Sequence, residues 1–353
     1  MSEPSVRPPA ARDASARPPA ARDASARPSA AGDASARSLA ALVARRLLMG
    51  LLVLGAVSLI VFTATELAPG DAASAAVGPD AGPAAVEEKR RELGLDRPAP
   101  VRYAEWLWGA VRGDFGTSYV SGVPVSEIVA ARAGNSMMLA LVTLVLLVPL
   151  AVGLGVWGGL REGSLTDRAL SAGILTMVSI PEFVVGSVLI LIFALHLDVL
   201  PAVSFLGPGA SVLDHPEILV LPVVTLLAGT IAHNARLVRA RVVEVVADDA
   251  VATARLNGVP EHRVVLRYVL PAALPPVIPL LARYVALLVG GALVVETLFG
   301  FPGLASVLVQ GSAGRDVPTV QAVALIVAAV TVLVNLLGDL LGIALDPLRR
   351  VPV

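Results

Sequence analysis

Six long apolar stretches decide what this chain of 353 residues can fold into. They are residues 47–65, 133–160, 169–197, 218–235, 268–299 and 317–338. A helix needs about 20 mainly apolar residues to cross the hydrocarbon core of a bilayer, and there every backbone polar group must be paired within the protein. The whole chain is 56% hydrophobic and only 16% charged, which also favours a bilayer. We therefore predict an all-α integral membrane protein with six transmembrane helices.

The arginines near these stretches predict the orientation. They gather before the first stretch, between the second and third, between the fourth and fifth, and after the sixth. Because cytoplasmic loops carry the excess of Lys and Arg, both termini are predicted to be cytoplasmic. The long segment 66–132 then lies outside, where Tyr103, Trp106 and Trp108 are predicted to anchor the membrane interface.

The N-terminal segment contains a ten-residue repeat that starts at Arg7, Arg17 and Arg27. Proline, alanine and alternating charge bury too little apolar surface to offset the entropy of ordering. We predict that residues 1–39 are a disordered cytoplasmic tail and that residues 40–353 form the membrane domain. A docking site for a partner protein is the alternative reading of the repeat.

Composition also excludes several functions. A net charge of −1 argues against a nucleic-acid partner. The chain has no cysteine, and its only lysine, Lys89, lacks the glycines of a phosphate-binding loop, so we expect it not to bind ATP itself. The four histidines show no metal-binding spacing, and no catalytic set lies in the spans. We expect no cofactor, no metal site and no enzymatic activity in this chain.

The polar segment 236–271 carries a helix–turn–helix pattern. Asp248 and Asp249 are candidate N-caps for a helix over 250–257, Gly258 suits a helix C-terminus, and Pro260 suits the start of the next helix. The small residues Ala250 and Ala254 would suit close packing in a groove of a partner protein. An ordinary helix on the membrane surface is the other reading.

Residues 252–258 (ATARLNG) and 268–271 (YVLP) resemble the EAA loop of ABC-importer permeases. Gly258, Leu270 and Pro271 are in register, whereas Ala252 replaces the usual glutamate and Thr253 the usual alanine. The stretch from Asp249 through Thr253 and Ala254 matches the variant of the peptide and nickel branch. Further motifs of that branch occur in the family's order, at residues 67–71, 92–98, 113–118, 179–183, 296–304, 315–321 and 335–341. The chain thus resembles the B-type permease of the dipeptide/oligopeptide importer family.

This resemblance implies a type I ABC-importer permease fold in a bacterial cytoplasmic membrane. It implies a second, homologous permease as partner, two cytoplasmic ATPase subunits that bind ATP and Mg, and an extracytoplasmic solute-binding protein. The solute would be a peptide or a related small molecule, with nickel as an alternative. The residues that would couple to the ATPases are Asp249, Ala250, Thr253, Ala254, Gly258, Leu270 and Pro271.

Three charges inside the spans are candidate pore residues, because an ionisable group in a bilayer is costly. At about 1.5 Å per residue, Glu182 and Arg283 lie at similar depth, while Glu296 is too far along the helix to pair with Arg283. Glu182 and Arg283 either pair with each other, or Arg283 lines the pore and contacts a solute carboxylate. Asp339, one turn from Asn335, is expected to serve helix packing.

Two rival classes make different predictions. An ion-driven secondary transporter would show inverted repeats with broken helices at matching positions, and an intramembrane enzyme would show a catalytic set. We find neither pattern in the sequence. Copurification of an ATPase would separate the three classes, whereas the identity of the solute and the direction of transport are not readable from these residues alone.

Overall fold

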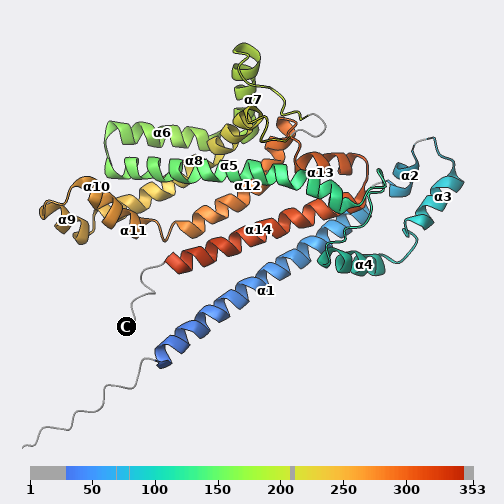
Figure 1. Ribbon diagram of the computed structural model, residues 1–353, viewed down its shortest axis with the longest axis horizontal. Coiled ribbons are helices and arrows are strands. Elements are labelled where there is room, and N and C mark those ends of the chain that lie inside the picture. The colour runs from blue at the N-terminus through green and yellow to red at the C-terminus, as the bar shows by residue number, and fades with distance from the viewer. Residues whose placement is uncertain (1–28, 69, 79, 207–210, 346–353) are drawn as a thin grey trace, which may run out of the picture.

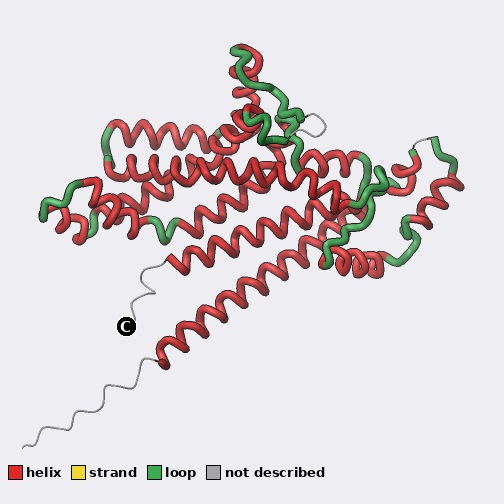
Figure 2. Tube along the Cα trace, viewed as in Figure 1, coloured by secondary structure: helices red, strands yellow, loops and turns green. Residues whose placement is uncertain are grey.

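The computed structural model describes residues 29–345 apart from 69, 79 and 207–210. For residues 29–42, 175, 178, 279–280, 282–289 and 342–345 it describes the backbone only. The described chain is helical throughout and contains no strand, apart from one isolated bridge between Thr117 and Pro124 (Figure 2). The predicted all-α fold is therefore confirmed.

Four helices of the described chain are long and apolar enough to cross a membrane. They are α1 (Ser29–Leu67), α5 (Val125–Leu160), α8 (Glu217–Val246) and α14 (Val317–Leu345). Each contains one of the predicted spans, and they run along the long axis of the molecule (Figure 1). α8 also continues past residue 235 through Arg236, Arg239 and Arg241, so the polar segment 236–271 begins inside this helix.

The third predicted span is interrupted, which corrects the expectation of one continuous helix. It consists of α6 (Leu165–Ser179), α7 (Glu182–Leu189) and the π-helical η1 (Ile190–His196). Ile180, which precedes Pro181, is extended with φ −96° and ψ 123°. The ring of a proline disfavours the helical conformation in the residue before it, so the chain turns here. α7 and η1 consequently point away from α6 (Figure 1).

The fifth predicted span is interrupted as well. The short α10 (Glu261–Val264), the π-helical η2 (Val265–Val269) and α11 (Leu270–Ala273) lead to a turn that contains Pro275 and Pro276. The apolar α12 (Ile278–Leu298) starts only after this turn. Consecutive prolines remove two helix donors, which accounts for the break.

The remaining helices lie at the two ends of the molecule. α2 (Ala72–Val77), α3 (Pro83–Glu92), α4 (Ala99–Val111) and α13 (Leu304–Ala313) lie at one end. The start of α1, α9 (Asp249–Leu256), α10 and the end of α14 lie at the opposite end (Figure 1). The first described residues of α1 and the last of α14 therefore lie on the side of segment 236–271, as the arginine pattern predicts. The compartment at that side stays a prediction.

The predicted tail falls mostly outside the described residues. Residues 1–28 are not described, and residues 29–39 already belong to α1. This stretch is rich in alanine, which has the highest helix propensity. The disorder of the repeat stays a prediction.

α8 is the central helix of the bundle. In the apolar part of α8, 67% of the residues are buried, compared with 11% in the apolar part of α1 and 17% in that of α14. Gly155 and Gly159 of α5 let α8 approach closely, because a Cβ on either would come within 2.8 Å of Val238 or Val242. These two small residues therefore serve the close packing of α5 on α8. The surfaces of α1 and α14, in contrast, are left for lipid or for other subunits.

Aromatic residues of the outer segment pack on α1. The rings of Tyr103 and Phe62 meet edge to face with centroids 5.2 Å apart, and the Tyr103 hydroxyl lies 2.8 Å from Ser58 Oγ. Trp106 packs on the same Phe62 ring, whereas Trp108 is exposed and stacks with Arg112. Two of the three predicted interfacial aromatics thus hold α4 against α1.

Candidate coupling site

The helix predicted over 250–257 is present as α9. The Asp248 side chain accepts a hydrogen bond of 2.9 Å from Ala250 N, so Asp248 is the N-cap. Asp249, the second candidate cap, is instead the first helical residue, where its negative charge favours the helix dipole.

Gly258 ends α9 in the conformation predicted from the sequence. Its φ is +75°, and Val259 N donates a 3.1 Å hydrogen bond to Ala254 O across the turn. No atom lies within 4 Å of the place that a Cβ would take. The glycine is therefore required by the backbone conformation and not by crowding. Pro260 follows as the N-cap of α10, which confirms its predicted position.

Leu270 and Pro271 form the first turn of α11, directly after η2. Proline has no amide hydrogen, so it cannot donate to the carbonyl four residues earlier, and its ring crowds that carbonyl. A π-helical turn often accommodates such a local mismatch within a helix. This pair therefore shapes the connection from the loop to α12.

α9 has one buried face. Val251 and Ala254 are 1% and 4% exposed, and they pack in a cluster of small aliphatic residues from α8, α10, η2, α11 and the turn before α12. The idea that Ala250 and Ala254 together face a partner is therefore wrong for Ala254. The side chain of Ala254 is small because α9 lies close to the core of its own chain.

The opposite face of α9 is exposed. Ala252, Thr253 and Leu256 point away from the cluster, and the side chain of Leu256 is 88% exposed. α9, which carries this residue, stands at one end of the molecule, far from α13 (Figure 1). An exposed leucine at a helix end provides an apolar contact point for a second protein. Sequence analysis did not single out Leu256.

An exposed ion pair connects α9 to α10. Arg255 Nη2 lies 2.6 Å from Glu261 Oε1, and both side chains are more than one third exposed. The hydrogen bond from Arg255 holds the pKa of the Glu261 carboxyl below its usual value. This pair bridges the turn at Gly258.

A largely buried ion pair connects the first turn of α6 to α8 on the same side of the molecule. Arg239 donates from Nε and Nη2 to the two carboxylate oxygens of Asp167, at 2.6 and 2.7 Å. Asp167 also accepts from Gly163 N at 3.0 Å, and its side chain is 4% exposed. The hydrogen bond from Arg239 lowers the pKa of Asp167. Arg239 of α8 therefore holds the start of α6 and the turn at Gly163 in place.

Glu182 lies at the start of α7, half-buried between α8 and α12. A Cβ at Gly229 of α8 would overlap its carboxylate, and one at Gly291 of α12 would lie 3.0 Å from its Oε2. The two glycines make room for the carboxylate. No hydrogen bond or ion pair joins it to another residue whose side chain is described.

The other two candidate charges have different positions. Arg283 lies in α12 eight residues, or about 12 Å, before Gly291, so the prediction that it shares the depth of the Glu182 carboxylate is wrong. Its side chain is outside the described part of the chain, and its pairing with Glu182 stays a prediction. Asp339 forms an ion pair of 2.9 Å with Arg46 of α1, and Asn335 donates to Thr331 O of its own helix. Asp339 thus joins α14 to α1, as expected for a residue that serves helix packing.

A buried carboxyl group organises the opposite end. Glu296 is 1% exposed, and its oxygens accept hydrogen bonds from Ser136 Oγ at 2.5 Å and from Ala305 N at 2.8 Å. It thereby caps α13, while Asn135 donates to Pro302 O at 2.9 Å. The sequence analysis considered Glu296 only as a partner for Arg283. Gly303, at the start of α13, has no side chain that could cap the helix, and this was the signal that an acceptor must come from elsewhere.

Asp316, 5% exposed, performs a similar task before α14. It accepts from Ser118 Oγ at 2.5 Å, from Tyr119 N at 2.8 Å and from Thr319 Oγ1 at 2.6 Å. A turn of the long outer segment is thus fixed to the start of the last span. The contact joins residues almost 200 positions apart, so no local sequence pattern could identify it.

Comparison with known proteins agrees with this arrangement. Residues 151–351 match the family described as the inner membrane component of binding-protein-dependent transport systems, and residues 39–140 match its N-terminal part. A probable peptide ABC transporter permease of Sinorhizobium fredii, y4tP, is 34% identical over 308 residues, which cover 87% of this chain and 98% of the relative. The oligopeptide transport system permease AppB of Bacillus subtilis is 33% identical over 311 residues, with the same coverage.

A solved structure was also found, an amino acid ABC transporter crystallised with histidines. It is 19% identical, covers 64% of this chain and 95% of that chain, and superposes with a TM-score of 0.40, which by itself establishes no shared fold. The family matches together cover most of the sequence, and the two permeases align over nearly their full length. This chain belongs to the family of inner membrane components of binding-protein-dependent transport systems.

Proposed function

We propose that this chain is the permease subunit of an ATP-driven peptide importer and forms half of its translocation pore. In the assembly that we propose, a second homologous permease completes the pore. Two cytoplasmic ATPase subunits bind ATP and Mg, and an extracytoplasmic protein delivers the solute. The names of the relatives support a peptide as the solute, while nickel or another small solute is the alternative.

The observation that carries the proposal is the outer face of α9. A short helix with a buried inner face and an exposed Leu256 stands at one end of the molecule, on the side of the start of α1 and the end of α14. Its cluster with η2 and α11 connects it to α12. A force on α9 would therefore reach a membrane helix through packed side chains. This is the arrangement that coupling to an ATPase requires.

Leu256→Ser tests the contact. We expect it to weaken retention of the ATPase and to lower solute-stimulated ATP hydrolysis, without destabilising the permease, because the side chain is almost fully exposed. Leu213→Ser is the matched control, since Leu213 is 68% exposed in the loop before α8. Normal ATPase retention and normal coupling in Leu256→Ser would contradict the proposed role of this face.

Gly258→Val tests the geometry of the turn independently. A β-branched residue at φ +75° costs about 1–2 kcal/mol, although no neighbour would clash with it. We expect membrane insertion to persist while transport and stimulated ATP hydrolysis fall. Wild-type coupling in this variant would remove the loop from the mechanism.

We further propose that Arg283 neutralises Glu182. The carboxylate lies between α8 and α12 without a partner among the described side chains. Arg283 belongs to α12 but precedes Gly291 by about 12 Å, so the pair requires both side chains to extend toward each other along this helix. Breaking a buried pair leaves an uncompensated charge, whereas removing both charges recovers much of the loss.

A double-mutant cycle on thermal stability and transport examines this pair. Glu182→Gln and Arg283→Gln should each destabilise the complex, and the double variant should recover much of the loss. If Arg283 instead contacts the solute, Glu182→Gln will be mild, Arg283→Gln will impair transport but not assembly, and the double variant will recover nothing. Additive effects on both readouts would rule out the pair.

The secondary-transporter alternative is less well supported. Its inverted repeats place broken helices at matching positions of the two halves. A break in the third span would then be matched in the sixth, but α14 is continuous.

A further inference from the structure

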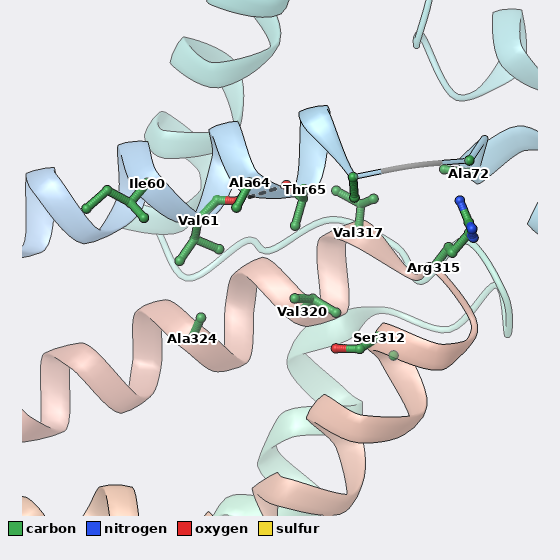
Figure 3. A pocket seen from close by; sticks show the side chains of 13 residues that line it. Ile60, Val61, Ala64, Thr65, Ala72, Ser312, Arg315, Val317, Val320 and Ala324 are labelled. Atoms are coloured by element: carbon green, nitrogen blue, oxygen red, sulfur yellow. Dashed lines mark hydrogen bonds between the residues drawn. The ribbon is translucent and has the colours of Figure 1, made fainter.

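A groove of about 360 Å³ lies between α1 and α14, at the end of the molecule that carries α13. Its volume falls within the range of about 300–1,000 Å³ that is typical of small-ligand sites. Most of its walls are aliphatic, with Ile60, Val61, Ala64, Val320 and Ala324 as the main lining residues. Figure 3 shows Arg315 at one end of the groove, and Ile60 and Ala324 toward the other.

Arg315 has no hydrogen bond or ion pair through its side chain to any other described side chain or backbone group. The carboxylates nearby are already used. Asp71, which lines a neighbouring hollow together with Arg315, pairs with Arg90 at 2.9 Å. Asp316, the next residue, accepts hydrogen bonds from Ser118 and Thr319. The positive charge at the mouth of the groove is therefore left without a counter-ion from this part of the chain.

The backbone around Arg315 is adapted to its side chain. Gly70 lies directly against the guanidinium, because a Cβ at this position would overlap it. Any other residue at position 70 would displace the charged group.

Arg315 itself has an unusual conformation. Its φ of +55° is left-handed, and Asp316 N donates a 2.8 Å hydrogen bond to Gly311 O around it, as in the common C-terminal helix cap. Glycine or asparagine usually occupies this position, because a larger side chain is less favourable there. An arginine at a position that favours glycine points to a use for its side chain.

We propose that this groove binds one phospholipid of the leaflet at the α13 end. The Arg315 guanidinium contacts the phosphate, and one acyl chain lies between α1 and α14. The groove runs along two helices that are mostly unburied within the chain, so lipid has access to it. Arginine matches the geometry of phosphate oxygens. Arg315 lies two residues before the start of α14, which places the charge at the membrane surface.

Photolabelling tests this site on the full chain in its assembled complex. The complex is reconstituted in phosphatidylcholine nanodiscs that contain a small fraction of phosphatidylglycerol with a diazirine in one acyl chain. After irradiation, mass spectrometry maps the labelled peptides. We expect labelling to concentrate on residues 60–68 and 317–324. Arg315→Gln should reduce this labelling on the order of tenfold, because a charged hydrogen bond is lost.

Matched variants and a second probe separate the contributions. Arg91→Gln removes an exposed arginine of α3 that does not line the groove, and should leave the labelling unchanged. Ala64→Phe fills the groove while Arg315 is intact, and it should abolish labelling there. A diazirine diacylglycerol, which lacks the phosphate, should label wild type and Arg315→Gln equally and weakly.

Three results would overturn the proposal. The first is labelling spread evenly over all membrane-facing helices. The second is equal labelling of the groove by the phosphatidylglycerol probe in wild type and Arg315→Gln. The third is protection of the groove by another protein subunit in the assembled complex, which would show that protein and not lipid occupies it.

Discussion

At the α13 end of the molecule, the buried carboxyl groups of Glu296 and Asp316 fix the connections with hydrogen bonds of 2.5–2.8 Å. We call these contacts the outer clamp. At the α9 end, residues 247–277 form the coupling segment, which is held by small aliphatic side chains and by the exposed pair Arg255–Glu261. The two ends are thus built from different interactions.

The difference matters for a protein that changes shape during transport. A buried network that is fully hydrogen-bonded has one geometry, and any departure from it leaves polar groups unsatisfied. Aliphatic packing and exposed ion pairs are less directional, and elements that move are usually drawn from the less stable parts of a structure. We therefore expect the outer clamp to stay rigid while the coupling segment moves.

The largest effect is expected from Glu296→Ala. It leaves the half-buried Ser136 hydroxyl and the buried Ala305 amide without their acceptor. This loss should cost about 2–5 kcal/mol and lower the melting temperature of the purified complex. Glu296→Gln keeps one acceptor oxygen and should be milder. Glu127→Ala, at an exposed position near the same end, is the control. A melting temperature unchanged in Glu296→Ala would mean that this end is not held by the clamp.

An intermediate effect is expected from Asp167→Asn, which breaks the buried pair with Arg239 on the α9 side but outside the coupling segment. Because the pKa of Asp167 is lowered in the folded state, its stabilising contribution is present above the usual value of 3.8 and is lost as the pH falls through the lowered pKa. Thermal melts of wild type and Asp167→Asn should therefore converge in acid. If the difference in melting temperature between wild type and Asp167→Asn does not change with pH, the charge of Asp167 is not what stabilises the contact between α6 and α8.

The smallest effect is expected from Glu261→Gln in the coupling segment. An exposed pair contributes about 0.2–1 kcal/mol and is screened by salt. The lowered pKa of Glu261 means that this contribution also disappears as the pH falls below its usual value of 4.5. Thermal melts at low and high salt provide the measurement. A loss as large as that of Glu296→Ala would erase the contrast between the two ends.

Local patterns were sufficient for the coupling segment. Asp248, Gly258 and Pro260 act within a few residues of their own position, through a cap, a left-handed turn and a helix start. Their conformational preferences are properties of the residue itself, so the sequence predicts them directly. The orientation of α9 was not predictable in the same way, because the burial of Ala254 depends on valines from other helices.

The sequence by itself determined that the chain is a helical membrane protein, because long apolar stretches have no stable alternative in a bilayer. It also determined the family, through motifs spread along the chain. Only the tertiary structure decided that the third and fifth spans are interrupted and that Glu296 and Asp316 close one end. It also decided that Arg315 lies beside Gly70 without a partner among the described residues. Such contacts join residues far apart in the sequence, and their free energy depends on which groups folding brings within reach.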